Sequence, residues 1–179
     1  RSIMESCAIL QYLGEKYPSP LLPLEFTTKW DVVQWVYWQA ANVGPNFGNK
    51  LSYTRYMDDV PVEAKSHPLE RFKKESMRLM SVLSARLTGR PYVCGENLTI
   101  ADIAIYPWVR SWKWSKVPVI EFPNLMEWID RVRARPGVAR GLGYGVDPAE
   151  IDQWSAERKA RYAKGGATIA GNENLRTKV

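Results

Sequence analysis

The sequence has little of the side-chain chemistry that metal sites and histidine-based catalysis require. It contains one histidine, His67, and two cysteines, Cys7 and Cys94, in 179 residues. With His67 alone, we predict no metal-ligand cluster and no Ser-His-Asp set. Both cysteines lie in apolar segments, so a disulfide framework is not expected and a reducing, cytoplasmic compartment fits. Neither a signal peptide nor a membrane-spanning run is visible, so no membrane partner is expected.

The sequence also lacks strand patterns and internal repeats. No segment of any length alternates polar and apolar residues, whereas apolar residues recur at three- and four-residue steps in several segments. The predicted fold class is therefore all-α, a helical bundle. With 179 residues, 45% of them hydrophobic, the chain is large enough to bury one full core.

The formal net charge of +6 does not indicate a nucleic-acid partner, because the charge is unevenly distributed. Between residues 157 and 179 there are six basic residues and only two acidic ones, so most of the excess lies in this segment. The rest of the chain is close to balanced. We therefore expect no nucleic-acid partner and interpret residues 165–179 as a flexible basic tail.

The segment from residue 92 to residue 112 carries the clearest local signal for a helix start. Thr99 is a good N-cap, and Asp102, three positions later, is placed to complete a capping box. Leu98 and Ile103 have the spacing of a hydrophobic staple around the same start. The residues that follow are apolar on nearly all sides, so this helix should be surrounded by others, with a bend at Pro107.

A second helix is expected from Thr28, because Thr28 and Asp31 repeat the capping-box spacing. It is rich in aromatic residues and should end at a break at Gly44 and Pro45. The eight Trp and nine Tyr of the chain fit either a groove or interface lined by rings, or a Trp-rich core. Further helices are predicted over residues 5–17, from 63 or 66 to 87, over 123–134 and over 148–163, with a loop or frayed helix at 48–62.

Several short motifs, taken together, resemble those of the cytosolic glutathione S-transferases, from Ser2 to about residue 141. Residues 97–104 (NLTIADIA) look like the family's capping-box motif, residues 133–138 (RARPGV) like its closing signature, and residues 4–10 (MESCAIL) like the end of its thioredoxin-like domain. The matches most like the bacterial Nu class and its fungal Ure2-like relatives are residues 35–39 (WVYWQ), 44–48 (GPNFG) and 69–72 (LERF).

The resemblance implies the C-terminal helical domain of a transferase, preceded by the last helix of an otherwise absent thioredoxin-like α/β domain. The domain organisation expected on this basis is the end of the thioredoxin-like domain at 1–17, a Pro-rich linker at 18–26, the all-α domain at 27–145, an extra helix at 146–164 and the basic tail at 165–179.

Glutathione is the cosubstrate that the resemblance implies, with no tightly bound cofactor. Ser6, at a helix start, can offer a hydroxyl and backbone N–H groups to a carboxylate, while Glu5 can accept from an ammonium group. This chemistry suits the amino-acid end of a γ-glutamyl group, although Ser6 is equally placed to cap its own helix. Arg71 matches a glutathione-contacting arginine of Nu-class relatives, and the alternative for Arg71 is an ordinary solvated side chain.

The second, apolar substrate is expected along the Trp-rich helix, where core packing is the competing explanation for each ring. The candidates for this pocket are Trp38, Asn42, Val43 and Phe47, with Trp108 and Trp112 opposite.

The resemblance further implies a homodimer that uses glutathione for conjugation to electrophiles or for disulfide reduction. The residues that would activate the glutathione thiol are expected upstream of Arg1, so this chain contains no predicted catalytic residue. Two alternatives stay open, a non-catalytic binding or regulatory module with the transferase fold, and a glutathione-dependent enzyme that cleaves aryl ethers.

Overall fold

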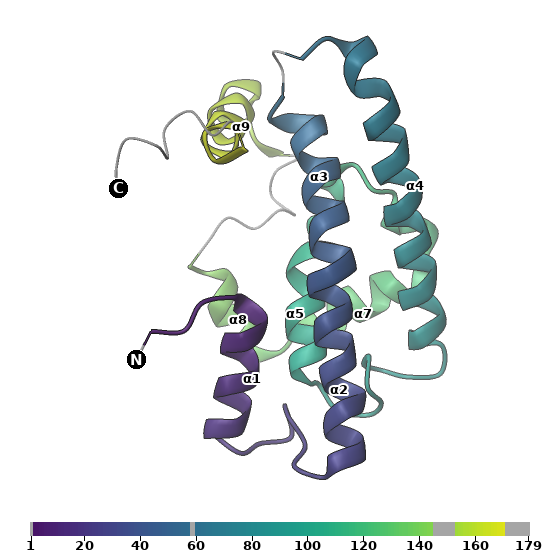
Figure 1. Cartoon of the computed structure of the whole chain (residues 1–179), viewed down its shortest axis with the longest axis vertical. Coiled ribbons are helices and arrows are strands. Elements are labelled where there is room, and N and C mark those ends of the chain that lie inside the picture. Colours follow the sequence, from purple (N-terminus) through teal and green to yellow (C-terminus); the bar gives the residue numbers. More distant parts are fainter. Residues whose placement is uncertain (1, 58–59, 145–152, 171–179) are drawn as a thin grey trace.

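The computed structural model describes residues 2–57, 60–144 and 153–170, with side chains up to residue 164. Within these ranges the chain is helical and contains no β-strand, which confirms the predicted all-α class. Figure 1 shows α2 and α3 as one long column, with α4 on one side and α1 and α8 on the other. The elements are α1 (Ser6–Lys16), α2 (Phe26–Trp38), the π-helical turn η1 (Gln39–Val43), α3 (Gly44–Arg55), α4 (Val62–Leu87), α5 (Ile100–Val109), α6 (Trp112–Ser115), the 3₁₀ turn η2 (Val119–Glu121), α7 (Pro123–Arg133), α8 (Pro136–Leu142) and α9 (Ala156–Ala170).

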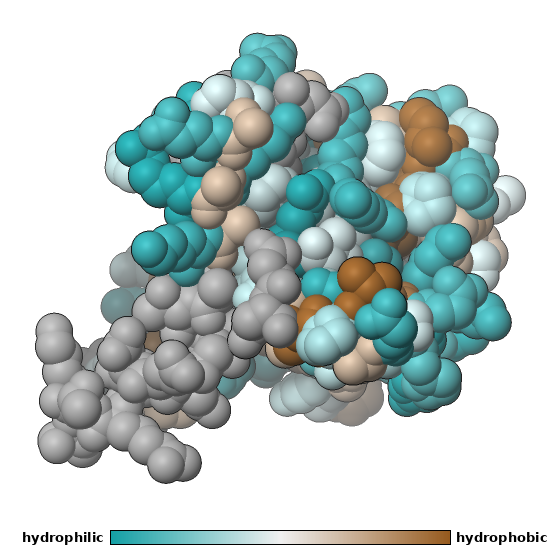
Figure 2. All heavy atoms as spheres, turned by 90° about the horizontal axis from the view of Figure 1, so that it is seen from above, coloured by the Kyte–Doolittle hydropathy of each residue, from teal (hydrophilic) through white to brown (hydrophobic). Residues whose placement is uncertain are grey.

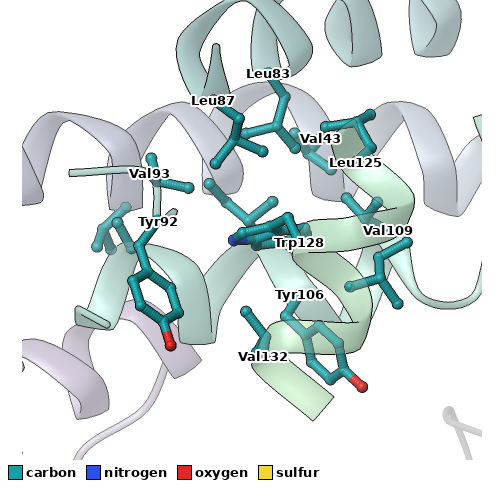
Figure 3. Close-up of a cluster of buried hydrophobic side chains, with 14 of the residues drawn as sticks. Val43, Leu83, Leu87, Tyr92, Val93, Tyr106, Val109, Leu125, Trp128 and Val132 are labelled. Atoms are coloured by element: carbon teal, nitrogen blue, oxygen red, sulfur yellow. The ribbon is translucent and has the colours of Figure 1, made fainter. Parts of the chain in front are cut away.

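The core forms where α4, α5 and α7 meet the α2–α3 column. Trp128 of α7 is fully buried and lies among side chains of several helices, including Leu83 and Leu87 of α4 and Val43 (Figure 3). The predicted apolar stripes of the long helix α4 and of α7 are confirmed, because their leucines and Trp128 point inward. Seen from above, the surface is mostly hydrophilic, with hydrophobic side chains in small separate groups (Figure 2).

The second helix does not end where the sequence predicts. Helical structure continues through Gly44 and Pro45 as α3, after the wider turn η1, in which the Gly44 N–H donates to the Gln39 carbonyl. Pro45 has no N–H to donate, and it is tolerated because it lies in the first turn of α3. The predicted break is therefore wrong. Of the two alternatives left open for residues 48–62, a loop or a frayed helix, residues 48–55 are helical and belong to α3.

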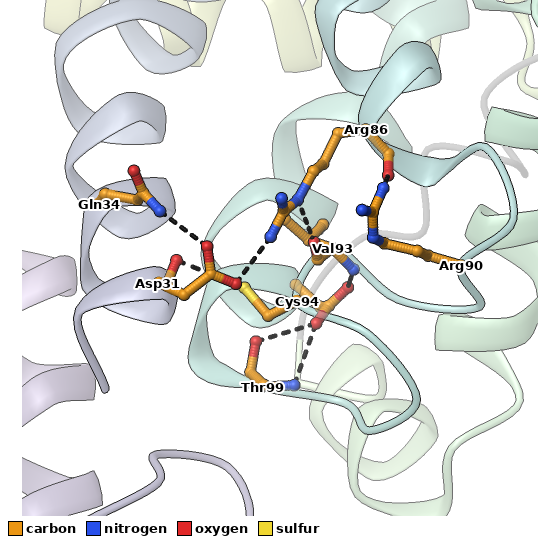
Figure 4. A network of polar contacts seen from close by, with 8 residues as sticks. Asp31, Gln34, Arg86, Arg90, Val93, Cys94 and Thr99 are labelled. Atoms are coloured by element: carbon orange, nitrogen blue, oxygen red, sulfur yellow. Dashed lines mark hydrogen bonds and ion pairs between the residues drawn. The ribbon is translucent and has the colours of Figure 1, made fainter. Parts of the chain in front are cut away.

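The start of α2 also differs from the prediction. The Glu25 carboxylate accepts hydrogen bonds from the N–H groups of Thr27 at 2.9 Å and Thr28 at 2.8 Å, and α2 begins at Phe26. The predicted capping box of Thr28 and Asp31 is wrong, because Glu25 reaches the free N–H groups first. Asp31 instead forms a 2.7 Å ion pair with Arg86 of α4 (Figure 4).

Arg86 connects three segments that are far apart in the sequence. Besides its ion pair with Asp31 of α2, it donates to the Val93 carbonyl at 2.7 Å, and its guanidinium lies 5.3 Å from the centroid of the Trp35 ring. This half-buried network holds α2, α4 and the loop before α5 in one arrangement, because planar guanidinium groups bind a carboxylate, a carbonyl and an aromatic face together.

The capping box of α5 is confirmed, with Thr99 and Asp102 in their predicted roles. Asp102 is completely buried, and its carboxylate accepts from the N–H of Thr99 at 3.0 Å, the N–H of Val93 at 2.9 Å and the indole N–H of Trp128 at 2.9 Å. The Asp102 carboxylate, which was predicted only as part of a helix cap, therefore also connects α5 to α7 and to the preceding loop.

The C-terminal helix α9 packs on a small aromatic cluster outside the main core. Trp154 and Tyr162 surround Trp114 of α6, with ring centroids of Tyr162 5.5 Å from Trp114 and 5.3 Å from Trp154. Helix α9 runs to Ala170, so the predicted helix end near residue 163 is too early. The predicted helix start at residues 147–150 lies outside the described residues. None of the described helices is long and apolar enough to cross a membrane.

Candidate functional site

The N-terminus of α1 is the first element of the candidate site. Glu5 and Ser6 are both exposed, and the Glu5 side chain makes no capping hydrogen bond to α1. Glu5 has a φ of 68°, a left-handed conformation that costs a non-glycine residue roughly 1–2 kcal/mol. Such strain is found most often at binding and catalytic sites. The first N–H groups of α1 and the Glu5 carboxylate therefore remain available to a ligand.

Helix α1 is joined to η1 by a contact between the half-buried Cys7 and the buried Gln39. The thiol of Cys7 donates to the side-chain carbonyl oxygen of Gln39 at 3.1 Å, and Gln39 is only 5% exposed. Burial raises the pKa of Cys7, and it raises the pKa of Cys94 to about 11. Neither thiol is therefore activated as a nucleophile, and Cys7 acts as a contact between α1 and the α2–η1 segment.

Arg71 lies on a different side of the molecule. Helix α1 packs against α5 and α2, whereas α4, which carries Arg71, packs against α3 and α7. Figure 1 shows α1 and α4 on opposite sides of the α2–α3 column. The exposed Arg71 borders a charged groove of about 490 Å³ along α4, together with His67, Glu70, Lys74, Glu75 and Arg78. One chain does not bring the three predicted glutathione-binding residues together.

Two of the six residues predicted for the second-substrate pocket are core residues instead. Val43 is 0% exposed and Phe47 is 1% exposed, and both belong to the main hydrophobic cluster. They cannot line an open pocket in this structure, and that part of the prediction is wrong. The apolar character of the helix led to the error, because it does not say which of its faces is covered.

Of the remaining four pocket candidates, Trp108 and Asn42 lie on different faces of the α2–α3 column. A Cβ atom added at Gly44 would lie 3.5 Å from Trp108, and one at Gly48 3.7 Å from it, so the Trp108 ring lies on this glycine face. Asn42 precedes Gly44 by two positions and so points roughly 200° away from it. The Asn42 amide donates to the Trp38 carbonyl at 3.2 Å, and the Trp38 ring contacts that of Trp35, with centroids 5.0 Å apart.

Trp108 therefore lies on a different face of the α2–α3 column from Asn42. Trp108 and Trp112 are both half-buried, and Trp112 begins α6, shortly after the end of α5. Of the predicted set, the half-buried Trp108 and Trp112 are the candidates for an apolar surface.

A cavity of about 710 Å³ lies elsewhere, between the linker, α5 and α8. Sequence reasoning missed it, because its walls come from four separate segments. The only hint of this cavity in the sequence is that the linker at 18–26 and the RARPGV motif at 133–138 both contain apolar residues. Arg110 and Arg135 also border the cavity. Its apolar lining includes Leu21, Leu98, Ile103, Tyr106, Val138 and Leu142.

Asp102 is the most deeply buried acid near these elements, and its environment argues for a structural role. Burial raises its pKa, while hydrogen bonds from Val93, Trp128 and Thr99 act in the opposite direction. All its contacts are with protein groups that fix the start of α5. It therefore supports the surface around Trp108 without facing it.

Comparison with known proteins agrees with this architecture. The model of the glutathione S-transferase C-terminal domain matches residues 48–136. The disulfide-bond oxidoreductase YfcG of Escherichia coli (strain K12) is 34% identical over 141 residues, which cover 79% of this chain and 63% of YfcG. The chain thus spans less than two thirds of the length of this curated relative.

Solved structures give the same result. A glutathione transferase family member from Pseudomonas fluorescens Pf-5, with two glutathione bound, has a TM-score of 0.73 and 35% identity over 78% of this chain and 63% of its own. The transferase URE2P6 from Phanerochaete chrysosporium, in complex with oxidized glutathione, has a TM-score of 0.71 and 26% identity over 84% of this chain and 69% of its own. The chain belongs to the glutathione S-transferase family, and the part it carries is the C-terminal helical domain.

Proposed function

We propose that this chain is the helical part of a glutathione-dependent enzyme, which conjugates glutathione to a small apolar electrophile or uses it to reduce disulfides. The observation that carries the proposal is the open N-terminus of α1, with Glu5 and Ser6 exposed. A γ-glutamyl group has a carboxylate and an ammonium on one carbon. The Ser6 hydroxyl and the first N–H groups of α1 would bind the carboxylate, and Glu5 would accept from the ammonium.

The relatives support both chemical outcomes. YfcG is named a disulfide-bond oxidoreductase, and the related structures from P. fluorescens and P. chrysosporium hold glutathione or oxidized glutathione. Glutathione therefore enters the proposal as cosubstrate. A cytoplasmic location is also proposed, because both cysteines are free thiols.

Activation of the glutathione thiol is proposed to come from residues outside this chain. Both described thiols have raised pKa values, so neither supplies a reactive thiolate. Helix α1 leaves an apolar face open, with Ile9 38%, Tyr12 43% and Leu13 44% exposed. An apolar face of this kind fits packing against a further domain of the intact protein. That domain would then hold the donor that stabilises the glutathione thiolate.

Arg71 enters the proposed site through a homodimer. In one chain it lies on the opposite side of the α2–α3 column from Ser6. If both residues bind the same glutathione, the arginine must come from a second copy of the chain. The charged face of α4 around Arg71 alternates in sign, with Glu70, Lys74, Glu75 and Arg78, and such a face can pair with its own copy in antiparallel orientation.

The binding part of the proposal is tested by calorimetric titration of the intact protein with glutathione. Ser6→Ala, Glu5→Gln and Arg71→Met should each weaken binding, by roughly tenfold or more, because each removes a hydrogen bond to a charged group. Arg90→Met is the control, since Arg90 is exposed, follows the end of α4 and donates to the Arg86 carbonyl. Unchanged affinity in the Ser6 and Glu5 variants would overturn the proposed site.

Mixing subunits tests whether the site is shared. In a heterodimer of one Ser6→Ala subunit and one Arg71→Met subunit, a shared arrangement places both substitutions in one site and leaves the other intact. Reassociated mixtures should therefore regain binding in about half of the heterodimer sites. If each site is built within one chain, mixing restores nothing, and the contribution of the second copy is refuted.

The alternative, a binding module without catalysis, is favoured by one observation, the absence of an activated cysteine thiol among the described residues. Turnover of an aromatic chloride or of a glutathione-mixed disulfide by the intact protein separates the two. Binding of glutathione without turnover of either substrate would support the module.

A further inference from the structure

The cavity between the linker, α5 and the α7–α8 segment takes no part in the proposed function. Its volume of about 710 Å³ is within the range of small-molecule sites, which hold roughly 300–1,000 Å³. Its walls contain none of the residues proposed to bind glutathione. Apolar side chains line most of it, among them Leu21, Leu98, Val132 and Leu142. The cavity is therefore a candidate for a second ligand site.

Hydrogen bonds between separate segments hold the walls of this cavity in place. The Ile100 N–H at the start of α5 donates to the Leu21 carbonyl of the linker at 2.8 Å. The Arg131 guanidinium of α7 donates to the Pro91 carbonyl at 2.8 Å, directly before Tyr92 in the sequence. The cavity is thus formed without a ligand, and a ligand would have to order little of the protein on binding.

Tyr92 brings an unpaired polar group to this cavity. It is only 8% exposed, and its hydroxyl takes part in no hydrogen bond within residues 2–57, 60–144 and 153–164. A tyrosine hydroxyl usually has a hydrogen-bond partner when it is buried. In Figure 3 this hydroxyl points away from Trp128, to the same side as the hydroxyl of Tyr106, which also borders the cavity. A ligand in the cavity can therefore supply the partner that Tyr92 lacks.

The charged residues that border the cavity are two arginines and one acid, so positive charge is in excess. Arg110 is engaged with the Tyr106 ring, whose centroid lies 5.9 Å from its guanidinium, and the acid is the exposed Glu96. Arg135, in the turn between α7 and α8, is exposed, and its side chain makes no hydrogen bond or ion pair with the described residues. Because a guanidinium matches a carboxylate with two parallel hydrogen bonds, Arg135 can bind a carboxylate at the edge of the cavity.

We propose that this cavity binds an aromatic carboxylate that carries a second polar group on its ring system. The rings of Tyr92 and Tyr106 suit an aromatic ligand, because aromatic rings pack offset or edge to face. The carboxylate would accept from Arg135, and the second polar group would accept from the Tyr92 hydroxyl. This site goes beyond the proposed function, because it uses none of the residues at the N-terminus of α1.

Calorimetric titration of the intact protein with three matched probes tests the site. The first probe is a hydroxynaphthoate whose two polar groups lie on opposite rings. Naphthoate lacks the hydroxyl, and naphthol lacks the carboxylate. The parent should bind hydroxynaphthoate at one site per chain, naphthoate about fivefold more weakly and naphthol about tenfold more weakly, because each loses the hydrogen bonds of one polar group.

Substitutions at the two polar residues should each affect only the probes that carry the matching group. Arg135→Met should weaken hydroxynaphthoate binding about tenfold and leave naphthol binding unchanged, because naphthol has no carboxylate. Tyr92→Phe should weaken hydroxynaphthoate binding about fivefold and leave naphthoate binding unchanged, because naphthoate has no hydroxyl. Arg140→Met is the control, since Arg140 is an exposed arginine of α8 that does not border the cavity.

Three results would overturn the proposal. The first is no saturable binding of hydroxynaphthoate to the intact protein, because the cavity would then be closed or filled by another part of that protein. The second is an equal affinity of Arg135→Met and Arg140→Met for hydroxynaphthoate, which would place the carboxylate elsewhere. The third is competition between hydroxynaphthoate and glutathione, which would place the probe at α1.

The site and the proposed function are tested separately. Ser6→Ala should bind hydroxynaphthoate like the parent, because Ser6 does not border the cavity. Failure of glutathione to bind at α1 would therefore leave the hydroxynaphthoate results unaffected.

Discussion

Replacing Asp102 by alanine should destabilise the whole domain and not only the start of α5. Asp102 is 0% exposed, and its carboxylate accepts from the N–H groups of Val93 and Thr99 and from the indole of Trp128, at 2.9–3.0 Å. The Thr99 hydroxyl also donates to this carboxylate, at 3.1 Å. The substitution leaves three buried N–H donors without an acceptor. The Thr99 hydroxyl is not counted, because a hydroxyl can rotate to a new acceptor and a backbone or indole N–H cannot.

The size of the effect follows from these three donors. A buried donor left unsatisfied costs about 1–3 kcal/mol, so the expected loss for three donors is about 3–9 kcal/mol. Because burial raises the pKa of Asp102, removing the carboxylate recovers part of its desolvation cost, which places the result toward the lower end. Domains of this kind have a free energy of unfolding of roughly 5–15 kcal/mol, so the loss is a large fraction of the total.

Urea unfolding, followed by circular dichroism and tryptophan fluorescence, measures this loss. Asp130→Ala is the matched control, because Asp130 is an exposed aspartate on α7, and its replacement should change the free energy of unfolding by about 0.5 kcal/mol or less. Asp102→Asn should be intermediate, since its amide nitrogen would face the Thr99 N–H. If Asp102→Ala unfolds at the same urea concentration as Asp130→Ala, the reasoning is refuted.

Three further predictions concern other parts of the chain. Hydrogen bonds from the N–H groups of Thr28 and Thr27 lower the pKa of Glu25 from 4.5 to about 2. The stabilisation by Glu25 is therefore present above pH 4.5 and lost as the pH falls toward 2. The difference in melting temperature between the parent and Glu25→Ala should shrink over that range. Cys94, with a pKa of about 11, should be alkylated by iodoacetamide more slowly than Cys7 at about pH 8, as followed by mass spectrometry, and the reverse order would contradict its burial. Tyr162→Ala should speed amide exchange in residues 156–164 without shifting the main unfolding transition, because its aromatic cluster is separate from the core.

Local signals explain why parts of the fold were predictable. The capping box of α5 depends on two residues three positions apart, so it is complete in the sequence, and Thr99 and Asp102 form it as expected. The long helix α4 has apolar residues on one stripe only, and that stripe is buried. The motif set likewise indicated the transferase family, because each motif is a short continuous segment.

The candidate site was less predictable, because its residues lie on helices that are apolar on several sides. Helix α2 and the turn after it carry aromatic and aliphatic side chains on several sides, so the sequence could not show that Val43 and Phe47 are buried while Trp108 of α5 is half-buried. The same holds for helix ends. Glu25 caps α2 because its carboxylate accepts from the Thr28 N–H, which the predicted capping box assigned to Asp31.

The sequence by itself therefore determined the all-α class, the start of α5, the inward faces of α4 and α7 and the family. Tertiary structure alone decided that Arg71 and Ser6 lie on opposite sides, that Asp31 pairs with Arg86, and that Lys50 is buried. The physical reason is the range of the interactions. Helix caps and apolar periodicity act within a few residues, whereas burial and charge at a junction depend on which helices pack together.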